Sequence, residues 1–151
     1  MNVLDWFTKK IDGWDISMRS KACDWQRDLA MALNNELTEG VRGGGLRLIS
    51  DNGSQPTTIK YMNDMVTIGI EQIITTYDKP KGNADTARMK RTIKEEDIWL
   101  NENETLEEAK EKLGKWNEND YNKNNVHRAL GYQSPEEFEV LYNNENLNEA
   151  E

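Results

Sequence analysis

The sequence has few residues of the types that mark secreted or membrane-bound proteins. It contains one cysteine, Cys23, among 151 residues, so no internal disulfide can form and a reducing compartment is favoured. Its apolar runs are much shorter than the roughly 18 residues that a spanning helix needs. The first ten residues, MNVLDWFTKK, lack the basic-then-apolar order of a secretion signal. These absences predict a cytoplasmic protein without a membrane anchor.

Large apolar side chains are present in sufficient number for a core. Hydrophobic residues make up 36% of the chain and five of them are tryptophans, which argues for a globular fold and against disorder. A chain of this length falls within the usual size of one domain. We therefore expect one domain over residues 1–142, followed by a polar, frayed tail over 143–151.

The net charge of −9 is unevenly distributed along the chain. Residues 1–78 carry 8 basic and 11 acidic side chains, residues 79–94 carry 6 and 1, and residues 95–151 carry 5 and 16. The negative net charge argues against a nucleic-acid partner, because phosphates repel it. Residues 79–94, hereafter the basic segment, are by contrast suited to face phosphates. On charge alone, a solvated helix face explains the basic segment equally well.

Apolar periodicity and turn residues predict an α/β domain. Pro56 is expected to open the second helix and Gly69 to end it. Thr105 with Glu108, and Ser134 with Glu137, form capping boxes that start two later helices. The expected elements follow the order β-β-α-β-α-β-α-α and end in a further short helix. They are strands over 2–7 and 11–18, a helix over 21–40, a strand over 46–50, a helix over 56–68, a strand over 70–77, helices over 84–99 and 105–122, and the short helix over 135–142.

Several segments together resemble the catalytic core of insertion-sequence transposases of the retroviral-integrase-like class. They are "LDWFTKKIDGWDIS", "SDNGSQPTT", "YDKPKGNADTARMKRTIKEE" and "HRALGYQSPEEFE", in the order and spacing of that family. The resemblance implies a ribonuclease H-like integrase core, with a mixed sheet flanked by helices. It also implies a DNA partner and a chemistry of DNA strand cleavage and transfer in transposition, by a metal-dependent nucleotidyltransferase or endonuclease.

The family chemistry requires a cluster of carboxylates. Two divalent cations about 4 Å apart clamp the attacking and leaving oxygens, and carboxylates hold hard ions such as Mg²⁺ or Mn²⁺. By resemblance, Asp51 is the second of three family acids, and the third, a glutamate, belongs at position 87. Ala87 stands there. The first acid lies in a strand that the family places before residue 1.

With one acid of three, we expect Asp51 to be a vestigial metal ligand and this chain to be inactive in cleavage. Glu95 lies about 12 Å along the helix axis from position 87 and is turned away by about 80°, so it is not expected to replace the missing glutamate. His127 is read as a structural residue, because the family does not use it as a metal ligand.

The basic segment gains a DNA-binding interpretation from the resemblance. On a helix, Ala87, Arg91 and Lys94 share one face, and in the family that face contacts DNA. The predicted DNA-binding residues are Lys81, Asn83, Arg88, Arg91 and Lys94.

Two hypotheses remain open from the sequence. The chain is a transposase or integrase core that has lost catalysis, or it is a noncatalytic dimerisation or protein-interaction module on the same fold. In either case the family's central first strand is missing from the sheet. Two strand edges would then lie unpaired, which predicts a homo-oligomer or a rearranged sheet.

Overall fold

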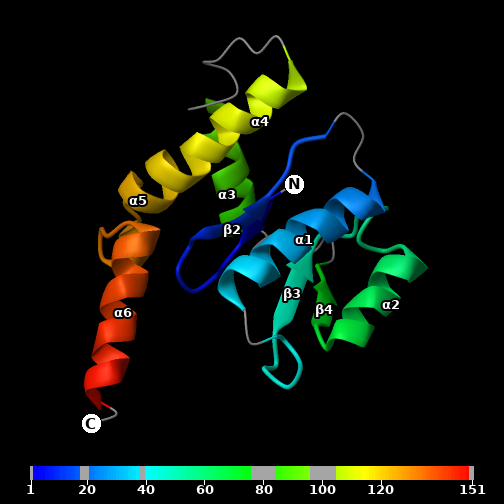
Figure 1. Cartoon of the computed structure of the whole chain (residues 1–151), viewed down its shortest axis with the longest axis horizontal. Helices are drawn as coiled ribbons and strands as arrows, with labels where there is room; N and C mark the ends of the chain where they lie inside the picture. Colours follow the sequence, from blue (N-terminus) through cyan, green and yellow to red (C-terminus); the bar gives the residue numbers. More distant parts are fainter. Residues whose placement is uncertain (1, 18–20, 38–39, 76–83, 96–104, 150–151) are drawn as a thin grey trace. The chain divides into compact units, whose positions relative to one another are not determined.

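The structure is a computed structural model that describes residues 2–17, 21–37, 40–75, 84–95 and 105–149. The predicted order of the first eight elements is confirmed, and further helical segments follow α4 (Figure 1). The elements are β1 (Asn2–Leu4), β2 (Ile11–Trp14), α1 (Ala22–Glu36), β3 (Arg47–Ser50), α2 (Ile59–Ile68), β4 (Glu71–Ile74), α3 (Ala84–Ile93), α4 (Leu106–Lys115), α5 (Asn122–Asn124) and α6 (Pro135–Glu149).

The chain forms two compact units, which are considered separately. The first comprises Met1–Val3 and Asp12–Glu102, and the second comprises Leu4–Ile11 and Asn103–Glu151. Among the described residues, no helix is both long enough and apolar enough to span a bilayer.

The described strands form two separate pairs instead of one continuous sheet. β1 pairs with β2, and β3 pairs with β4 in parallel register, from Arg47 opposite Glu71 to Ser50 opposite Ile74. The amides of Glu71 and Thr75 donate to the carbonyls of Leu46 and Ser50. Because alternate residues of a parallel strand bond to the same neighbour, the backbone groups of Arg47 and Ile49 point away from β4. No strand of the described part pairs with that edge of β3.

The core of the first unit lies where α1 and α2 cover β3 and β4. The buried side chains of Leu29, Tyr61, Met65 and Ile70 form its centre. The ring of Trp25 stands edge-on to Tyr61 at a centroid distance of 6.2 Å, a favourable geometry for aromatic pairs. Partly buried Leu33, Val41, Leu46, Leu48 and Ile68 complete the cluster.

β2 packs directly on the backbone of α1 at Gly13. A methyl group built on Gly13 would lie 2.9 Å from the amide nitrogen of Ala32 and 3.0 Å from its Cβ, and it would also overlap the Asp28 carbonyl oxygen. Only a residue without a side chain permits this approach.

The limits of α2 partly correct the sequence prediction. Pro56 does not open the helix; it lies buried in the turn before it. The cap is Thr58, whose hydroxyl oxygen accepts the Tyr61 amide hydrogen at 3.3 Å. Gly69 ends the helix as predicted, with a φ of 85° that suits glycine.

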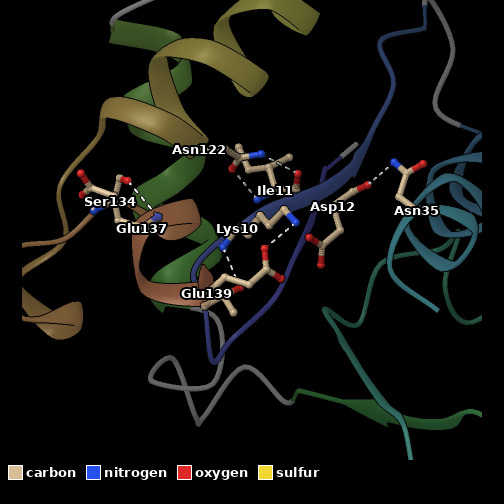
Figure 2. A network of polar contacts seen from close by, with 9 residues as sticks. Lys10, Ile11, Asp12, Asn35, Asn122, Ser134, Glu137 and Glu139 are labelled. Atoms are coloured by element: carbon tan, nitrogen blue, oxygen red, sulfur yellow. Dashed lines mark hydrogen bonds and ion pairs between the residues drawn. The ribbon is translucent and has the colours of Figure 1, made fainter. Parts of the chain in front are cut away.

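In the second unit, the hairpin between β1 and β2 is joined to the C-terminal helices by polar contacts (Figure 2). The side chain of Asn122 accepts the Ile11 amide hydrogen at 2.9 Å and donates to the Ile11 carbonyl at 3.0 Å. Nearby, the ammonium of Lys10 pairs with the carboxylate of Glu139 at 2.8 Å. The buried amide thus completes the bonding of a strand residue as a neighbouring strand would.

Both helices with predicted capping boxes begin where the sequence places them, and the box at Ser134 and Glu137 forms both of its bonds. The Thr105 hydroxyl oxygen accepts the Glu108 amide hydrogen at 3.1 Å. Glu137 accepts the Ser134 amide hydrogen at 2.9 Å, and its own amide donates to the Ser134 hydroxyl at 3.3 Å. The helix that follows Ser134 is longer than predicted, because α6 continues to Glu149 through most of the segment expected to fray. Between α4 and α5 the chain forms a π-helical stretch, Trp116–Tyr121.

The first strand is also shorter than predicted and ends at Leu4. The Asp5 carboxylate accepts the Phe7 amide hydrogen at 2.6 Å, and the Asp5 amide donates to the Lys10 carbonyl at 2.9 Å. These bonds turn the chain at Asp5, three residues before the predicted connection.

Candidate functional site

Asp51 directly follows β3, at the end of the parallel strand pair. Its side chain is exposed, and its Oδ1 accepts the Gly53 amide hydrogen at 3.0 Å. A bond from an aspartate side chain to the amide two residues on forms an Asx turn. The turn is held against β4 by Gln72, whose amide donates to the Pro56 carbonyl at 2.9 Å and to the Ser50 hydroxyl at 3.2 Å. The fold therefore presents one carboxylate at the strand end.

Ala87 lies on α3 and is exposed. The opposite side of the helix is fixed by Met89 and Ile93, which are both buried. Glu95 is the next described acid after position 87, and its carboxylate pairs with the guanidinium of Arg91 at 3.6 Å. A methyl group thus occupies the position that the family resemblance assigns to a metal-binding glutamate.

The donor set of the described residues does not fit a pair of divalent cations. Among them, no group of three or more histidine, cysteine, aspartate or glutamate side chains is arranged to hold a metal ion. One oxygen of Asp51 is already engaged by Gly53, and Ala87 offers no oxygen. Two-metal chemistry requires several convergent carboxylates, so no catalytic step is assigned to this site.

The acids near the start of α1 have a structural role. The guanidinium of Arg27 lies 2.9 Å from Asp15 and 3.8 Å from Asp24. The Lys21 amide donates to Asp24 and lowers the pKa of that carboxyl. Burial raises the pKa of Asp28 to about 6. Asp15, which follows β2, is buried and paired with Arg27.

Cationic side chains line the exposed part of α3 and its continuation. Arg88, Lys90, Arg91 and Lys94 are all exposed, whereas Met89 and Ile93 face the interior. Lys90 is not among the residues selected from the sequence, although its place between Arg88 and Arg91 marks it as a member of the same group. The predicted contacts Lys81 and Asn83 lie outside the described residues.

His127 takes part in local structure. Its backbone amide donates to the Gln133 carbonyl at 2.9 Å, and its ring lies 5.4 Å from that of Tyr121 in an edge-on arrangement. The loop that follows turns at Gly131, with a φ of 69°. These contacts agree with the structural reading of His127.

The chain was compared with protein families, with known proteins and with solved structures. Residues 68–135 match the family model described as integrase core domain. Over 136 residues the chain is 30% identical to the transposase for insertion sequence element IS904 of Lactococcus lactis subsp. lactis (strain IL1403); the match covers 90% of this chain and 52% of the relative. The chain thus spans about half the length of that relative.

Solved structures show the same fold. The catalytic core domain of BIV integrase superposes with a TM-score of 0.61 at 18% identity, covering 97% of this chain and 88% of that one. A chain of the simian T-cell lymphotropic virus intasome in complex with PP2A regulatory subunit B56 gamma also gives a TM-score of 0.61, at 15% identity, covering 83% of this chain and 42% of that one.

The fold is therefore the ribonuclease H-like α/β fold of retroviral integrase catalytic cores, as the sequence predicts. Together with the matches to the integrase core domain and the transposase, it supports a likeness of the chain to the insertion-sequence transposase and integrase-like class. That class is in general dependent on divalent metals.

Proposed function

We propose that this chain is the core domain of a DNA transposition protein, that it holds duplex DNA by its phosphate backbone, and that it does not cleave DNA in this form. The observation that carries the proposal is the exposed cationic surface of α3 and its continuation, formed by Arg88, Lys90, Arg91 and Lys94. The match to the integrase core domain model includes this helix. The core would occupy residues 1–142, with residues 143–151 as its polar extension.

The charge distribution supports weak, sequence-independent binding. The basic segment has a net charge of +5 within a chain of net charge −9. Its cations attract phosphates at close range, while the acidic remainder opposes the approach of DNA at low salt. We expect a dissociation constant at the weak end of the nonspecific range, about 10⁻⁴ M.

The proposal includes self-association in the cytoplasm. The backbone groups of Arg47 and Ile49 face away from β4, and within the part of the chain that the structure describes no strand pairs with them. An unpaired strand edge favours pairing with another chain. The single cysteine supports a reducing compartment.

Replacing Arg91 and Lys94 by alanine is expected to weaken DNA binding and its dependence on salt. Each neutralised phosphate contributes about −0.9 to the slope of log affinity against log salt concentration. Three or four contacts therefore imply a slope near −3 for the parent, and the double variant should show about −1. Fluorescence anisotropy of a labelled duplex at several salt concentrations measures both quantities. Duplexes of different sequence should be affected alike, because these side chains would contact the backbone.

The matched control removes two exposed cations of the same unit, Arg47 and Lys60, which pair with Glu71 and Asp64. This variant has the same net charge as the first but keeps α3 intact, so its slope should stay near that of the parent. If both variants lost the same DNA affinity and salt slope, overall charge alone would explain the effect. If the parent binds no duplex even at low salt, the noncatalytic interaction module becomes the better reading.

Divalent cations are expected to leave stability almost unchanged. A specific site would add about 2.7 kcal/mol at a hundred times its dissociation constant, which corresponds to a Tm rise of roughly 5–10 °C at this chain length. We expect less than about 1 °C in millimolar Mg²⁺ or Mn²⁺, measured by differential scanning fluorimetry. A large rise that Asp51→Asn abolishes would show that a site exists.

Ala87→Glu by itself is not expected to produce DNA cleavage. The substitution returns one carboxylate to α3, but Asp51 and this new carboxylate would be two of the three acids that the family chemistry uses. Incubation of the variant with labelled duplex and Mn²⁺, followed by a denaturing gel, tests this. Cleavage that depends on both Asp51 and the new glutamate would overturn the proposal of inactivity.

A further inference from the structure

An exposed group of aromatic and apolar side chains lies in the second unit, at the hairpin tip and on α6. The ring of Phe7 stands edge-on to Phe138 at 5.3 Å and to Tyr142 at 4.8 Å. Phe138 and Tyr142 are stacked one helical turn apart, with 15° between their planes. We call this group, with its neighbours, the aromatic surface; it consists of Trp6, Phe7, Phe138, Leu141 and Tyr142.

Much of this surface is open to solvent. The exposed fractions are 43% for Trp6, 52% for Phe7, 46% for Leu141 and 44% for Tyr142. Isolated exposed apolar residues are ordinary in proteins, but a contiguous group marks an interaction site. Aromatic residues also supply much of the binding energy at protein interfaces.

The aromatic surface is held in place before any partner arrives. Asp5 bonds to the Phe7 amide, and the Thr8 hydroxyl oxygen accepts the Lys10 amide hydrogen at 3.2 Å. The ion pair between Lys10 and Glu139 then joins the hairpin tip to α6. A partner would meet rings already ordered, which reduces the entropic cost of association.

The negative charge of α6 favours a positively charged partner. Between Pro135 and Glu149 the sequence contains five glutamates and neither lysine nor arginine. Glu145 is exposed and lies three residues beyond Tyr142 on the same helix. Rings beside carboxylates favour an approaching cation through both Coulomb attraction and cation–π contact.

A second copy of this chain fits the aromatic surface poorly. Pairing α6 with α6 would bring acidic helices together. The basic helix α3 has its larger apolar side chains, Met89 and Ile93, buried, so they are not exposed as an apolar anchor. A different protein with both cations and exposed apolar residues satisfies both requirements.

We propose that the aromatic surface is a docking site for a basic amphipathic helix of another protein. Apolar side chains of that helix pack against Phe7, Leu141 and Tyr142, and its lysines or arginines face Glu145, since Glu137 and Glu139 are already bonded to Ser134 and Lys10. This is recognition of an amphipathic helix through its apolar face, with charge complementarity. The inference is independent of DNA binding by α3.

The probe is a fluorescein-labelled helical peptide of about 15 residues built from leucine and lysine, with leucines at i, i+3, i+4 and i+7. Tested against the full chain, it should bind saturably. Tyr142→Ala should weaken binding about tenfold, and Glu145→Lys should weaken it several-fold. Val140→Ala is the matched control, since Val140 is 56% exposed on the same helix but outside the aromatic surface; it should change the affinity less than about twofold.

Two further measurements make the result decisive. A peptide of the same composition, scrambled to lack an apolar face, should bind at least about tenfold more weakly. If Tyr142→Ala proves unfolded by circular dichroism, Leu141→Ala replaces it. Equal binding of the two peptides, or no effect of either substitution, would overturn the proposal. So would sedimentation that shows the parent as a dimer and Tyr142→Ala as a monomer, because the surface would then join two copies.

Discussion

Gly13→Ala is expected to lower the free energy of unfolding by about 3 kcal/mol, a large effect for one methyl group. The added carbon would lie within 3.0 Å of Ala32 and would overlap the Asp28 carbonyl oxygen. These are mainly backbone atoms of α1, which cannot move aside as a flexible side chain would. To remove this overlap, β2 would have to move away from α1, and the packing between them would be lost.

The matched control for this prediction is Gly44→Ala. The nearest atom to a methyl group there is the Val41 carbonyl oxygen at 3.5 Å, an ordinary contact. Because alanine restricts the unfolded chain more than glycine does, this variant should keep or slightly gain stability. Urea unfolding followed by tryptophan fluorescence compares both with the parent. A Gly13→Ala midpoint equal to that of Gly44→Ala would show that β2 does not press on α1.

Asn122→Ala is expected to destabilise the second unit by about 2–4 kcal/mol. Asn122 and Ile11 are both buried, and the amide satisfies both the N–H and the C=O of Ile11. Removing the amide leaves the N–H and the C=O of Ile11 without this partner. A buried polar group without a hydrogen bond lowers the stability more than the loss of a bond at the surface does. Asn122→Asp retains an acceptor for the N–H but loses the donor to the C=O, so it should also destabilise.

The control for Asn122 is Asn124→Ala, because Asn124 is exposed and its side-chain amide donates to the nearby carbonyl of Asn119 at 2.6 Å. We expect a change within about 0.5 kcal/mol. Hydrogen exchange of the amides of α4 and α6 localises the effect, since the chain divides into two compact units and protection is measured amide by amide. Unchanged protection in Asn122→Ala would contradict the role assigned to the amide.

The fold class, the order of the elements and the position of Asp51 follow from the sequence, because short-range signals encode them. Thr105 with Glu108 and Ser134 with Glu137 start helices through bonds over three residues. Gly69 ends α2 because its own backbone conformation suits no other residue as well. The methyl group at position 87 is likewise evident from the sequence, because the motif around it has a regular spacing.

Other features depend on atoms that are distant along the chain, and the tertiary structure decides them. The need for glycine at position 13 arises from α1, and the role of Asn122 arises from a strand residue 111 positions earlier. The pairing of the described strands in two separate sheets depends on which edges meet, and β-propensity does not encode that choice. The aromatic surface arises because the hairpin tip packs against α6, and this packing brings Phe7 edge-on to both Phe138 and Tyr142.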